Sequence, residues 1–317
     1  MPARIVLLVT SPRLPAGLLT AAAWDVVRAH PVFTGAESDQ AVALRANGVP
    51  VTLIEPDPER LLTEIGSGAV VWLAGAAGDE AFARRLGLRL ANEPSLAELE
   101  LMYGSWDPPG ARLLDAVAVM DRLVSPGGDP WKRAQTHRTL AKYLLEESYE
   151  AYDAIESDDL DALREELGDV LLQIVLHARL AEELPEDERW SVDDVAGDLV
   201  DKMVRRNPHV FAGQSVADLE EITDNWERIK KAEKSRDSVL DGIALSQPAL
   251  ALTAKILQRA ERAGLRVPLP EGLDLGSVLL RQVAAADADA EAALRQAALR
   301  YADEVRAAEQ KNVGPAE

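Results

Sequence analysis

The chain has 317 residues, enough for two or three small domains, and its 47% apolar and 28% charged residues are typical of a globular protein rather than a disordered one. A formal net charge of −20 argues against a general nucleic-acid binder or a membrane-surface protein, since both carry basic patches. The sequence has no cysteine, which excludes disulfides and thiolate metal sites, and no apolar run approaches the length of a membrane span. These features predict a cytoplasmic protein whose partners include neither nucleic acid nor membrane.

The first hundred residues alternate between strand and helix patterns. Three short apolar runs rich in β-branched residues, at 4–9, 49–54 and 69–74, are each followed by proline or glycine. Helical stretches lie between these runs, and strands that alternate with helices indicate a parallel sheet. We therefore predict a small α/β domain over residues 1–108.

From about residue 112 the pattern is helical almost throughout. Ser-Pro-Gly-Gly at 125–128 interrupts it, Asp159 offers an N-cap side chain, and Pro208 ends a further helix. We predict that residues 112–236 form an all-α bundle, so that the protein is mainly α after its small α/β domain. The helices predicted in this region span 112–124, 131–156, 159–184, 192–206 and 217–234.

Two pairs of acidic residues stand three positions apart on neighbouring predicted helices. Glu147 and Glu150 lie on one helix, and Glu166 and Asp169 lie on the next. Helical side chains at i and i+3 share one face, with Cβ atoms about 5–6 Å apart. The short link at 157–159 makes the two helices antiparallel neighbours, so we expect both pairs to converge beside the apolar faces that the helices bury. The apolar stripes expected on the two helices are Leu140, Leu144 and Ala151 on the first, and Leu163, Val170 and Ile174 on the second.

Convergent carboxylates are unfavourable without partners, so they usually bind metal or share protons. Magnesium prefers oxygen ligands and keeps coordination sites open for substrate phosphates, which makes it the expected ion. A solvated acidic face is the plain alternative. A di-iron bundle needs Glu-x-x-His on two helices, but Ile174 stands three residues before His177, the nearest histidine. His177 is instead expected to be packed or interfacial.

The segments around these acids carry a set of further motifs. They include Gly-Gly-Asp-Pro-Trp before the first acidic helix, Glu-Leu-Gly-Asp within the second, and Lys-Met-Val-Arg-Arg-Asn-Pro-His beyond both. The segments lie at 127–131, 135–137, 143–150, 165–169, 202–211, 225–230 and 238–241.

Together these motifs resemble the MazG family of nucleoside triphosphate pyrophosphohydrolases, which belongs to the all-α NTP pyrophosphatase superfamily. The resemblance covers about residues 112–241. One departure is Asp129, where the family commonly has cysteine; a turn or helix cap is expected there, with no loss of activity.

The resemblance implies an activity and a set of ligands. It implies hydrolysis of NTP or dNTP substrates to nucleoside monophosphate and pyrophosphate, in nucleotide-pool housecleaning, by a homodimer. The implied cofactor is Mg²⁺, with Mn²⁺ as a substitute. A water whose pKa the metal lowers is expected to attack the α-phosphorus. The implied metal ligands and catalytic residues are Glu147, Glu150, Glu166 and Asp169.

Basic and aromatic residues further along are candidate substrate contacts. Lys202, Arg205 and Arg206 share one helix face and are expected to grip the β and γ phosphates, unless they form a solvated basic helix end. Trp226 is expected to cover the base or sugar, and Lys230, four residues later, to reach a phosphate. A core tryptophan with a surface lysine is the alternative for this second pair.

The C-terminal region, residues 237–317, is predicted to contain a helix at 248–263 and an alanine-rich helical tail at about 277–310. Within it, Leu-Gly-Ser-Val-Leu-Leu at 275–280 echoes Leu-Gly-Asp-Val-Leu-Leu at 167–172. Some family members carry two tandem domains, so we interpret the region as a degenerate second repeat that has lost its metal site. Chance similarity between two leucine-rich helices is the alternative.

The N-terminal residues 1–108 have a fold-level likeness to the tetrapyrrole-methylase domain that is fused to some MazG proteins. The region is about half the expected length, and its loop at 10–12 lacks the glycines that such a cofactor loop needs. No methyltransferase activity is expected from it.

Two other classes of function stay open from the sequence. One is a nucleotide-binding regulator that holds a triphosphate or an alarmone without fast turnover, and the other is a structural helical dimerisation module. All four acidic positions are intact, which favours the enzyme.

Overall fold

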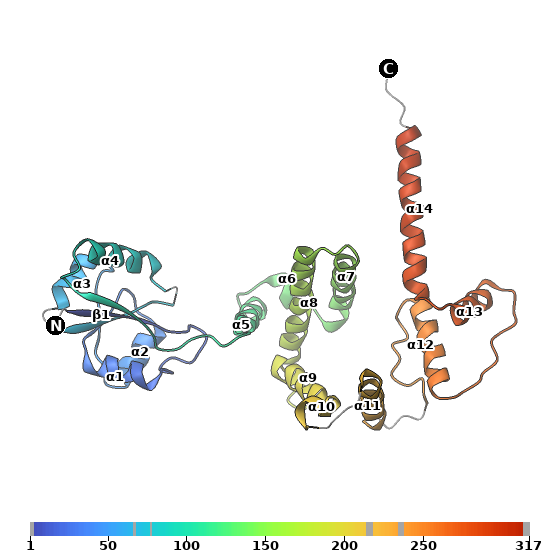
Figure 1. Cartoon of the computed structure of the whole chain (residues 1–317), viewed down its shortest axis with the longest axis horizontal. Coiled ribbons are helices and arrows are strands. Elements are labelled where there is room, and N and C mark those ends of the chain that lie inside the picture. Colours follow the sequence, from blue (N-terminus) through green and yellow to red (C-terminus); the bar gives the residue numbers. More distant parts are fainter. Residues whose placement is uncertain (1–2, 66–67, 77, 214–217, 234–237, 313–317) are drawn as a thin grey trace, which may run out of the picture. The chain divides into compact units, whose positions relative to one another are not determined.

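A computed structural model of the chain describes residues 3–65, 68–76, 78–213, 218–233 and 238–312. The chain divides into two compact units, Met1–Leu199 and Val200–Glu317, and Figure 1 labels their helices and strand β1. Several residues that bound predicted segments lie outside the described residues: 1–2, 217, 234, 237 and 313–317.

The first unit begins with a five-stranded parallel sheet of order β3-β2-β4-β1-β5. Helices alternate with the strands along the chain, as the sequence predicts. The strands are β1 Arg4–Val9, β2 Val32–Thr34, β3 Val51–Leu53, β4 Ala69–Leu73 and β5 Glu98–Tyr103. The helices are α1 Ala21–Ala29, α2 Asp39–Ala46, α3 Pro58–Ile65 and α4 Glu80–Asn92.

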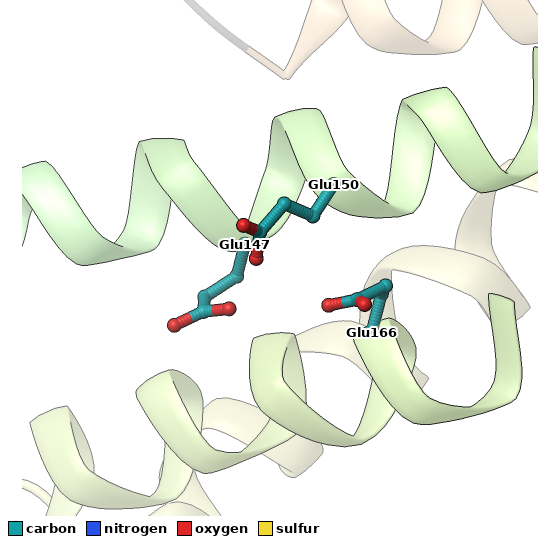
Figure 2. A group of neighbouring side chains, drawn as sticks. All are labelled: Glu147, Glu150 and Glu166. Atoms are coloured by element: carbon teal, nitrogen blue, oxygen red, sulfur yellow. The ribbon is translucent and has the colours of Figure 1, made fainter. Parts of the chain in front are cut away.

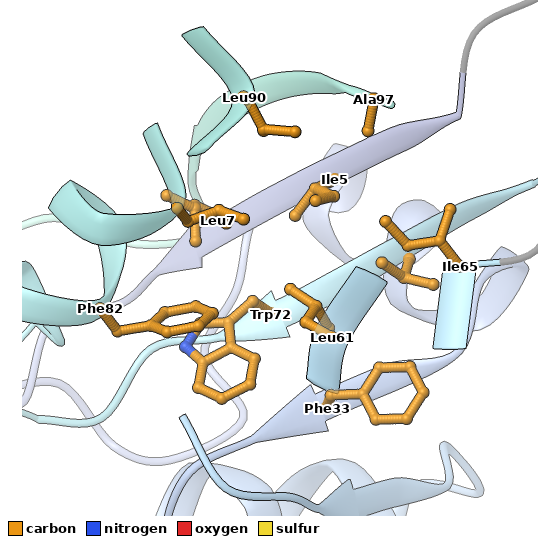
Figure 3. Packing of buried hydrophobic residues seen from close by; sticks show 11 residues of the cluster. Ile5, Leu7, Phe33, Leu61, Ile65, Trp72, Phe82, Leu90 and Ala97 are labelled. Atoms are coloured by element: carbon orange, nitrogen blue, oxygen red, sulfur yellow. The ribbon is translucent and has the colours of Figure 1, made fainter. Parts of the chain in front are cut away.

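The sheet is covered on both faces because alternate strand residues point to opposite sides. In β1, Ile5 packs with Leu61 of α3 and Leu86 of α4, whereas Val6 packs in the cluster that holds residues of α1 and α2. Figure 3 shows the first of these cores, in which the Trp72 ring lies 4.1 Å from that of Phe82. The near-continuous apolar runs at β1 and β4 follow from burial on both faces.

The sequence pattern predicted only three strands and missed β2 and β5. β2 has three residues, too few for a periodic signal. β5 is an edge strand that alternates glutamates with apolar residues and is largely exposed, so it lacks an apolar run. The predicted strand at 49–54 is shorter in the structure, where β3 covers Val51–Leu53.

The rest of the first unit is helical. Its small core joins Met120 and Val124 of α5 to Leu140 of α7 and to Val175 and Leu176 of α8. The helices are α5 Arg112–Val124, α6 Pro130–Arg133, α7 His137–Glu156, α8 Leu160–Ala181 and α9 Val192–Arg206, whose last residues belong to the second unit.

The prediction of one helix over 131–156 is wrong, because the chain breaks before His137. Thr136 accepts a hydrogen bond from the Thr139 backbone N–H, and the Thr139 hydroxyl accepts one from the Thr136 backbone N–H, which is a capping box that starts a new helix. Asp129, the departure from the family motif, caps α6 by accepting from the Lys132 backbone N–H at 2.6 Å, as expected.

The turn after α5 requires glycine. Gly127 has a positive φ of 83°, and a Cβ at Gly128 would lie 2.3 Å from the Leu123 carbonyl oxygen. The Ser-Pro-Gly-Gly signal in the sequence therefore marks a real chain reversal.

The secondary-structure elements described for the second unit are all helices. The single helical tail predicted over 277–310 is in fact two helices, and Asp274 caps the first of them by accepting from the Ser277 backbone N–H at 2.9 Å. Among the helices described, none combines the length and the apolar character needed to cross a membrane. The helices are α10 Pro208–Phe211, α11 Leu219–Ala232, α12 Ala249–Arg262, α13 Leu275–Ala285 and α14 Ala290–Asn312.

Candidate metal centre

The acidic residues lie on an antiparallel helical hairpin made by α7 and α8. Asp158 adopts the left-handed conformation with φ 55°, and the Asp158 and Asp159 backbone N–H groups donate to the Ile155 and Ala154 carbonyl oxygens, which closes α7 in a Schellman motif. The Asp159 side chain then accepts from the backbone N–H groups of the first turn of α8. A single residue thus ends one helix and begins the next, which keeps the link short.

The hairpin brings three carboxylates together from its two helices. One carboxylate oxygen from each of Glu147, Glu150 and Glu166 lies within 4.8 Å of the others. Figure 2 shows the three carboxylates between the facing helices, two from α7 and one from α8. Glu147 and Glu166 are half-buried and Glu150 is exposed, so the group lies at the edge of the hairpin core and is open to solvent on one side.

The electrostatics of the group favour a bound cation. Burial raises the pKa of Glu147, and the nearby charges of Asp169 and Glu150 raise it further. Burial likewise raises the pKa of Glu166, with further contributions from Glu150 and Asp169. Asp169 is outside the tightest group of three, yet its charge acts on members of that group from both helices.

The donor set fits a hard divalent cation. Carboxylate oxygens are the protein ligands that such ions prefer. Within the described part of the chain, none of Glu147, Glu150 and Glu166 forms an ion pair with lysine or arginine. A cation between the helices would offset the mutual repulsion that raises these pKa values. We call Glu147, Glu150, Glu166 and Asp169 the acidic cluster.

The apolar faces beside the acidic cluster differ in part from the expected stripes. Leu140 and Ala151 of α7 are buried as expected, but Leu144 is exposed. On α8, Ile174 was expected in the buried stripe and is instead 39% exposed. The buried residues of α8 instead include Gln173, Val175 and Leu176. The Gln173 Oε1 has no hydrogen-bond partner in the described structure.

His177 is packed against a second histidine rather than placed at the acidic cluster. Its Nδ1 lies 2.7 Å from that of His137 at the start of α7, and the two rings are stacked with 5.0 Å between centroids. The expectation of a packed histidine is therefore confirmed. The His137 ring also stacks on Trp190 at 6.2 Å, so aromatic contacts join the open end of the hairpin to the chain before α9.

The basic candidates meet a carboxylate that sequence reasoning missed. Arg205 and Arg206, at the end of α9, both donate to Glu233, which follows α11. The Arg206 guanidinium also lies 5.3 Å from the centroid of the Trp226 ring. Lys202 of α9 and Lys230 of α11 are half-buried. A signal for Glu233 was present in the sequence, since positions 226, 230 and 233 follow the i, i+4, i+7 spacing of one helix face.

The fold combines a parallel α/β sheet with a helical hairpin, and three glutamates of that hairpin lie close enough to hold a metal ion. The family model of the MazG nucleotide pyrophosphohydrolase domain matches residues 135–211, which include the whole hairpin, α9 and α10. An uncharacterized 26.1 kDa protein from Streptomyces cacaoi is 49% identical over 235 residues, which are 73% of this chain and 95% of that protein. The chain belongs to the MazG family.

The chain is also similar to a named enzyme and to a solved structure. The nucleoside triphosphate pyrophosphohydrolase of Mycobacterium tuberculosis is 48% identical over 201 residues, 63% of this chain and 59% of that enzyme. The crystal structure of a mazG-related protein from Thermotoga maritima is matched over 37% of this chain and 97% of that one, at 27% identity and a TM-score of 0.32. The chain thus spans 59% of the length of the mycobacterial enzyme.

Proposed function

We propose that this protein hydrolyses nucleoside triphosphates to monophosphate and pyrophosphate with a divalent metal, Mg²⁺ by preference and Mn²⁺ as a substitute. The observation that carries the proposal is the convergence of Glu147, Glu150 and Glu166 within 4.8 Å in a matched MazG domain. The printed name of the mycobacterial relative gives the reaction class. Housecleaning of NTP and dNTP pools in the cytoplasm is the corresponding role.

The acidic cluster is the proposed metal-binding part of the site. The acidic cluster holds the metal, which when bound supplies positive charge to the triphosphate and lowers the pKa of a coordinated water. Glu147 and Glu166 are half-buried and burial raises the pKa of each, so a cation would stabilise their charged forms.

The basic residues of the second unit are proposed to contact the phosphates of the substrate. Lys202, Arg205 and Arg206 contact the β and γ phosphates, since guanidinium and ammonium groups make charge-assisted hydrogen bonds to phosphate oxygens. Trp226 covers the base or sugar and Lys230 reaches a phosphate. The stacking of Arg206 on Trp226 supports a common location for these side chains.

We further propose that two copies assemble into the all-α bundle of this superfamily. Leu145 of α7 and Leu160 and Leu167 of α8 are all more than half exposed in one chain. Apolar side chains gathered on one hairpin are characteristic of an interface. The proposed catalytic domain is 112–236, with 1–108 as a separate α/β domain and 237–317 as a degenerate second repeat.

A product-resolved hydrolysis assay tests the function. The purified protein is given standard and modified triphosphates with Mg²⁺, with Mn²⁺ or with chelator, and products are separated by ion exchange. We expect monophosphate and pyrophosphate only when metal is present. Diphosphate plus phosphate would contradict the proposed bond cleavage. Tight binding without turnover would instead identify a nucleotide-binding regulator, and neither binding nor turnover would leave a structural module.

A further inference from the structure

Three side chains of the second unit form one ion-pair group that joins α9 to the end of α11. The Arg205 Nε donates to Glu233 Oε1 at 2.7 Å. Arg206 donates through Nη2 to Glu233 Oε2 at 2.6 Å, and its Nε lies 3.1 Å from the same oxygen. One carboxylate therefore binds two guanidinium groups. We call Arg205, Arg206 and Glu233 the basic cluster.

The two arginines differ in how far they are withdrawn from solvent. The Arg206 and Glu233 side chains are only 12% and 14% exposed, whereas Arg205 is 53% exposed. Arg206 is also covered on one side by the Trp226 ring. Since Arg206 binds Glu233 through two nitrogens and both side chains are largely withdrawn from solvent, Glu233 is not readily released from Arg206. Arg206 therefore holds Glu233 in place, and Arg205 is the arginine that is more accessible to solvent.

The contact between Glu233 and Arg205 leaves the outer edge of the guanidinium available. It uses Nε, and among the described residues the Arg205 Nη groups have no hydrogen bond or ion pair. Those Nη groups retain four N–H donors, which suit the oxygens of a phosphate. A guanidinium already held in place loses less side-chain freedom when it binds a ligand.

We propose that Glu233 is a positioning residue, which holds Arg205 with its Nη edge presented to the polyphosphate chain of the substrate. This inference rests on the proposed function and adds a residue that the sequence analysis did not select. The opposite role would be competition, with Glu233 occupying the arginines until phosphate displaces it. The low exposure of the Arg206 and Glu233 side chains argues for a permanent support, and the two roles predict opposite changes in affinity.

A double-mutant cycle tests the proposal. Arg205→Ala, Glu233→Ala and the double variant are compared with the wild type for KM and kcat with ATP and Mg²⁺. The dissociation constant for inorganic tripolyphosphate with Mg²⁺ is measured by calorimetry. We expect Arg205→Ala to raise KM and this dissociation constant about tenfold, the loss of one good phosphate contact. Glu233→Ala should produce most of that increase, and the double variant should be no worse than Arg205→Ala.

Matched variants separate positioning from a general structural effect. Glu233→Asp should recover part of the affinity, because it restores the charge at a shorter reach. Glu233→Gln keeps the shape without the charge and replaces Glu233→Ala if that variant does not fold. Arg228→Ala removes an exposed arginine of α11 and should leave both constants unchanged.

Three results would overturn the inference. The first is a KM increase in the double variant equal to the product of the two single-variant increases, and the second is a KM in Glu233→Ala below that of the wild type. The third is a dissociation constant for tripolyphosphate that is the same in Glu233→Ala and in the wild type. A wild type that binds tripolyphosphate without hydrolysing ATP would refute the proposed function instead. The calorimetric cycle would still decide the role of Glu233 in that case.

Discussion

The acidic cluster and the basic cluster balance their charges in opposite ways. In the acidic cluster, burial and neighbouring carboxylates raise the pKa values of Glu147 and Glu166. In the basic cluster, hydrogen bonds from Arg206 and Arg205 lower the pKa of Glu233 to about 2. The carboxylates of the first group repel one another, while the carboxylate of the second is compensated by two guanidinium groups. The charges next to a carboxylate therefore indicate whether it is a candidate cation ligand or a partner that holds another side chain.

The largest effect should follow from removing one carboxylate charge at the proposed metal centre. We expect Glu147→Gln to lower kcat by at least about a hundredfold, a loss of about 2.7 kcal/mol of transition-state stabilisation. Asp169→Asn should behave alike, and circular dichroism should show the fold intact. Glu156→Gln changes the same residue type at the exposed end of α7 and serves as the matched control. Turnover near the wild-type rate in Glu147→Gln would remove the acidic cluster from the reaction.

Metal addition should distinguish the two clusters without any substrate. A ligand that binds only the folded state stabilises it by about 2.7 kcal/mol at a hundred times its dissociation constant. We expect Mg²⁺ or Mn²⁺ to raise the melting temperature of the wild type and chelator to reverse the change. The increase should disappear in Glu147→Gln and persist in Glu233→Gln. An equal increase in Glu147→Gln would locate the metal elsewhere.

The pH dependence of stability should have opposite signs at the two clusters. A carboxyl whose pKa is raised on folding contributes stability at low pH, which is lost as pH rises from the ordinary value of 4.5 through the raised value. Glu233 contributes stability above 4.5, which is lost as pH falls towards about 2. Comparing urea denaturation of the metal-free wild type with Glu147→Gln and Glu233→Gln from pH 3 to 8 isolates each contribution.

Protons should also compete with metal at the acidic cluster. We therefore expect the metal-induced rise in melting temperature to shrink between pH 7 and pH 5. Metal binding that does not change over this range would show that the carboxylates with raised pKa are not the ligands.

These contrasts also mark how much the sequence could predict. Glu147 and Glu150, and Glu166 and Asp169, each stand three residues apart, so helical periodicity alone puts each pair on one face. The link between α7 and α8 is short enough to make the two helices neighbours. The convergence of Glu147, Glu150 and Glu166 was therefore predictable from local rules.

Other features depend on contacts that no local rule specifies. Glu233 meets Arg206 across 27 positions of sequence, and only its helix-face spacing from Trp226 pointed to it. The exposure of Ile174 depends on which face of α8 packs against α5 and α7. The apolar pattern of the sequence did not determine that face. The break before α7 needed recognition of the Thr136 capping box.

The smallest effect concerns the turn that aligns the acidic cluster. Asp159→Ala removes the cap of α8 and should cost about 1 kcal/mol, the usual value for a lost N-cap. If opening of that first turn is local, amide exchange over residues 160–166 should become about fivefold faster. Exchange in α11 should stay unchanged, which restricts the effect to the acidic side of the comparison.

Asp158→Gly changes the neighbouring residue in the opposite direction. Because Asp158 is left-handed at φ 55°, in the position of a Schellman motif that glycine prefers, this variant should be neutral or stabilising by up to about 1 kcal/mol. Its amides over residues 160–166 should exchange no faster than those of the wild type. Slower metal-dependent turnover in Asp159→Ala, with wild-type turnover in Asp158→Gly, would tie activity to the start of α8 and hence to the placement of Glu166. Equal turnover in both variants would mean that packing between α7 and α8 positions the acids without help from the cap.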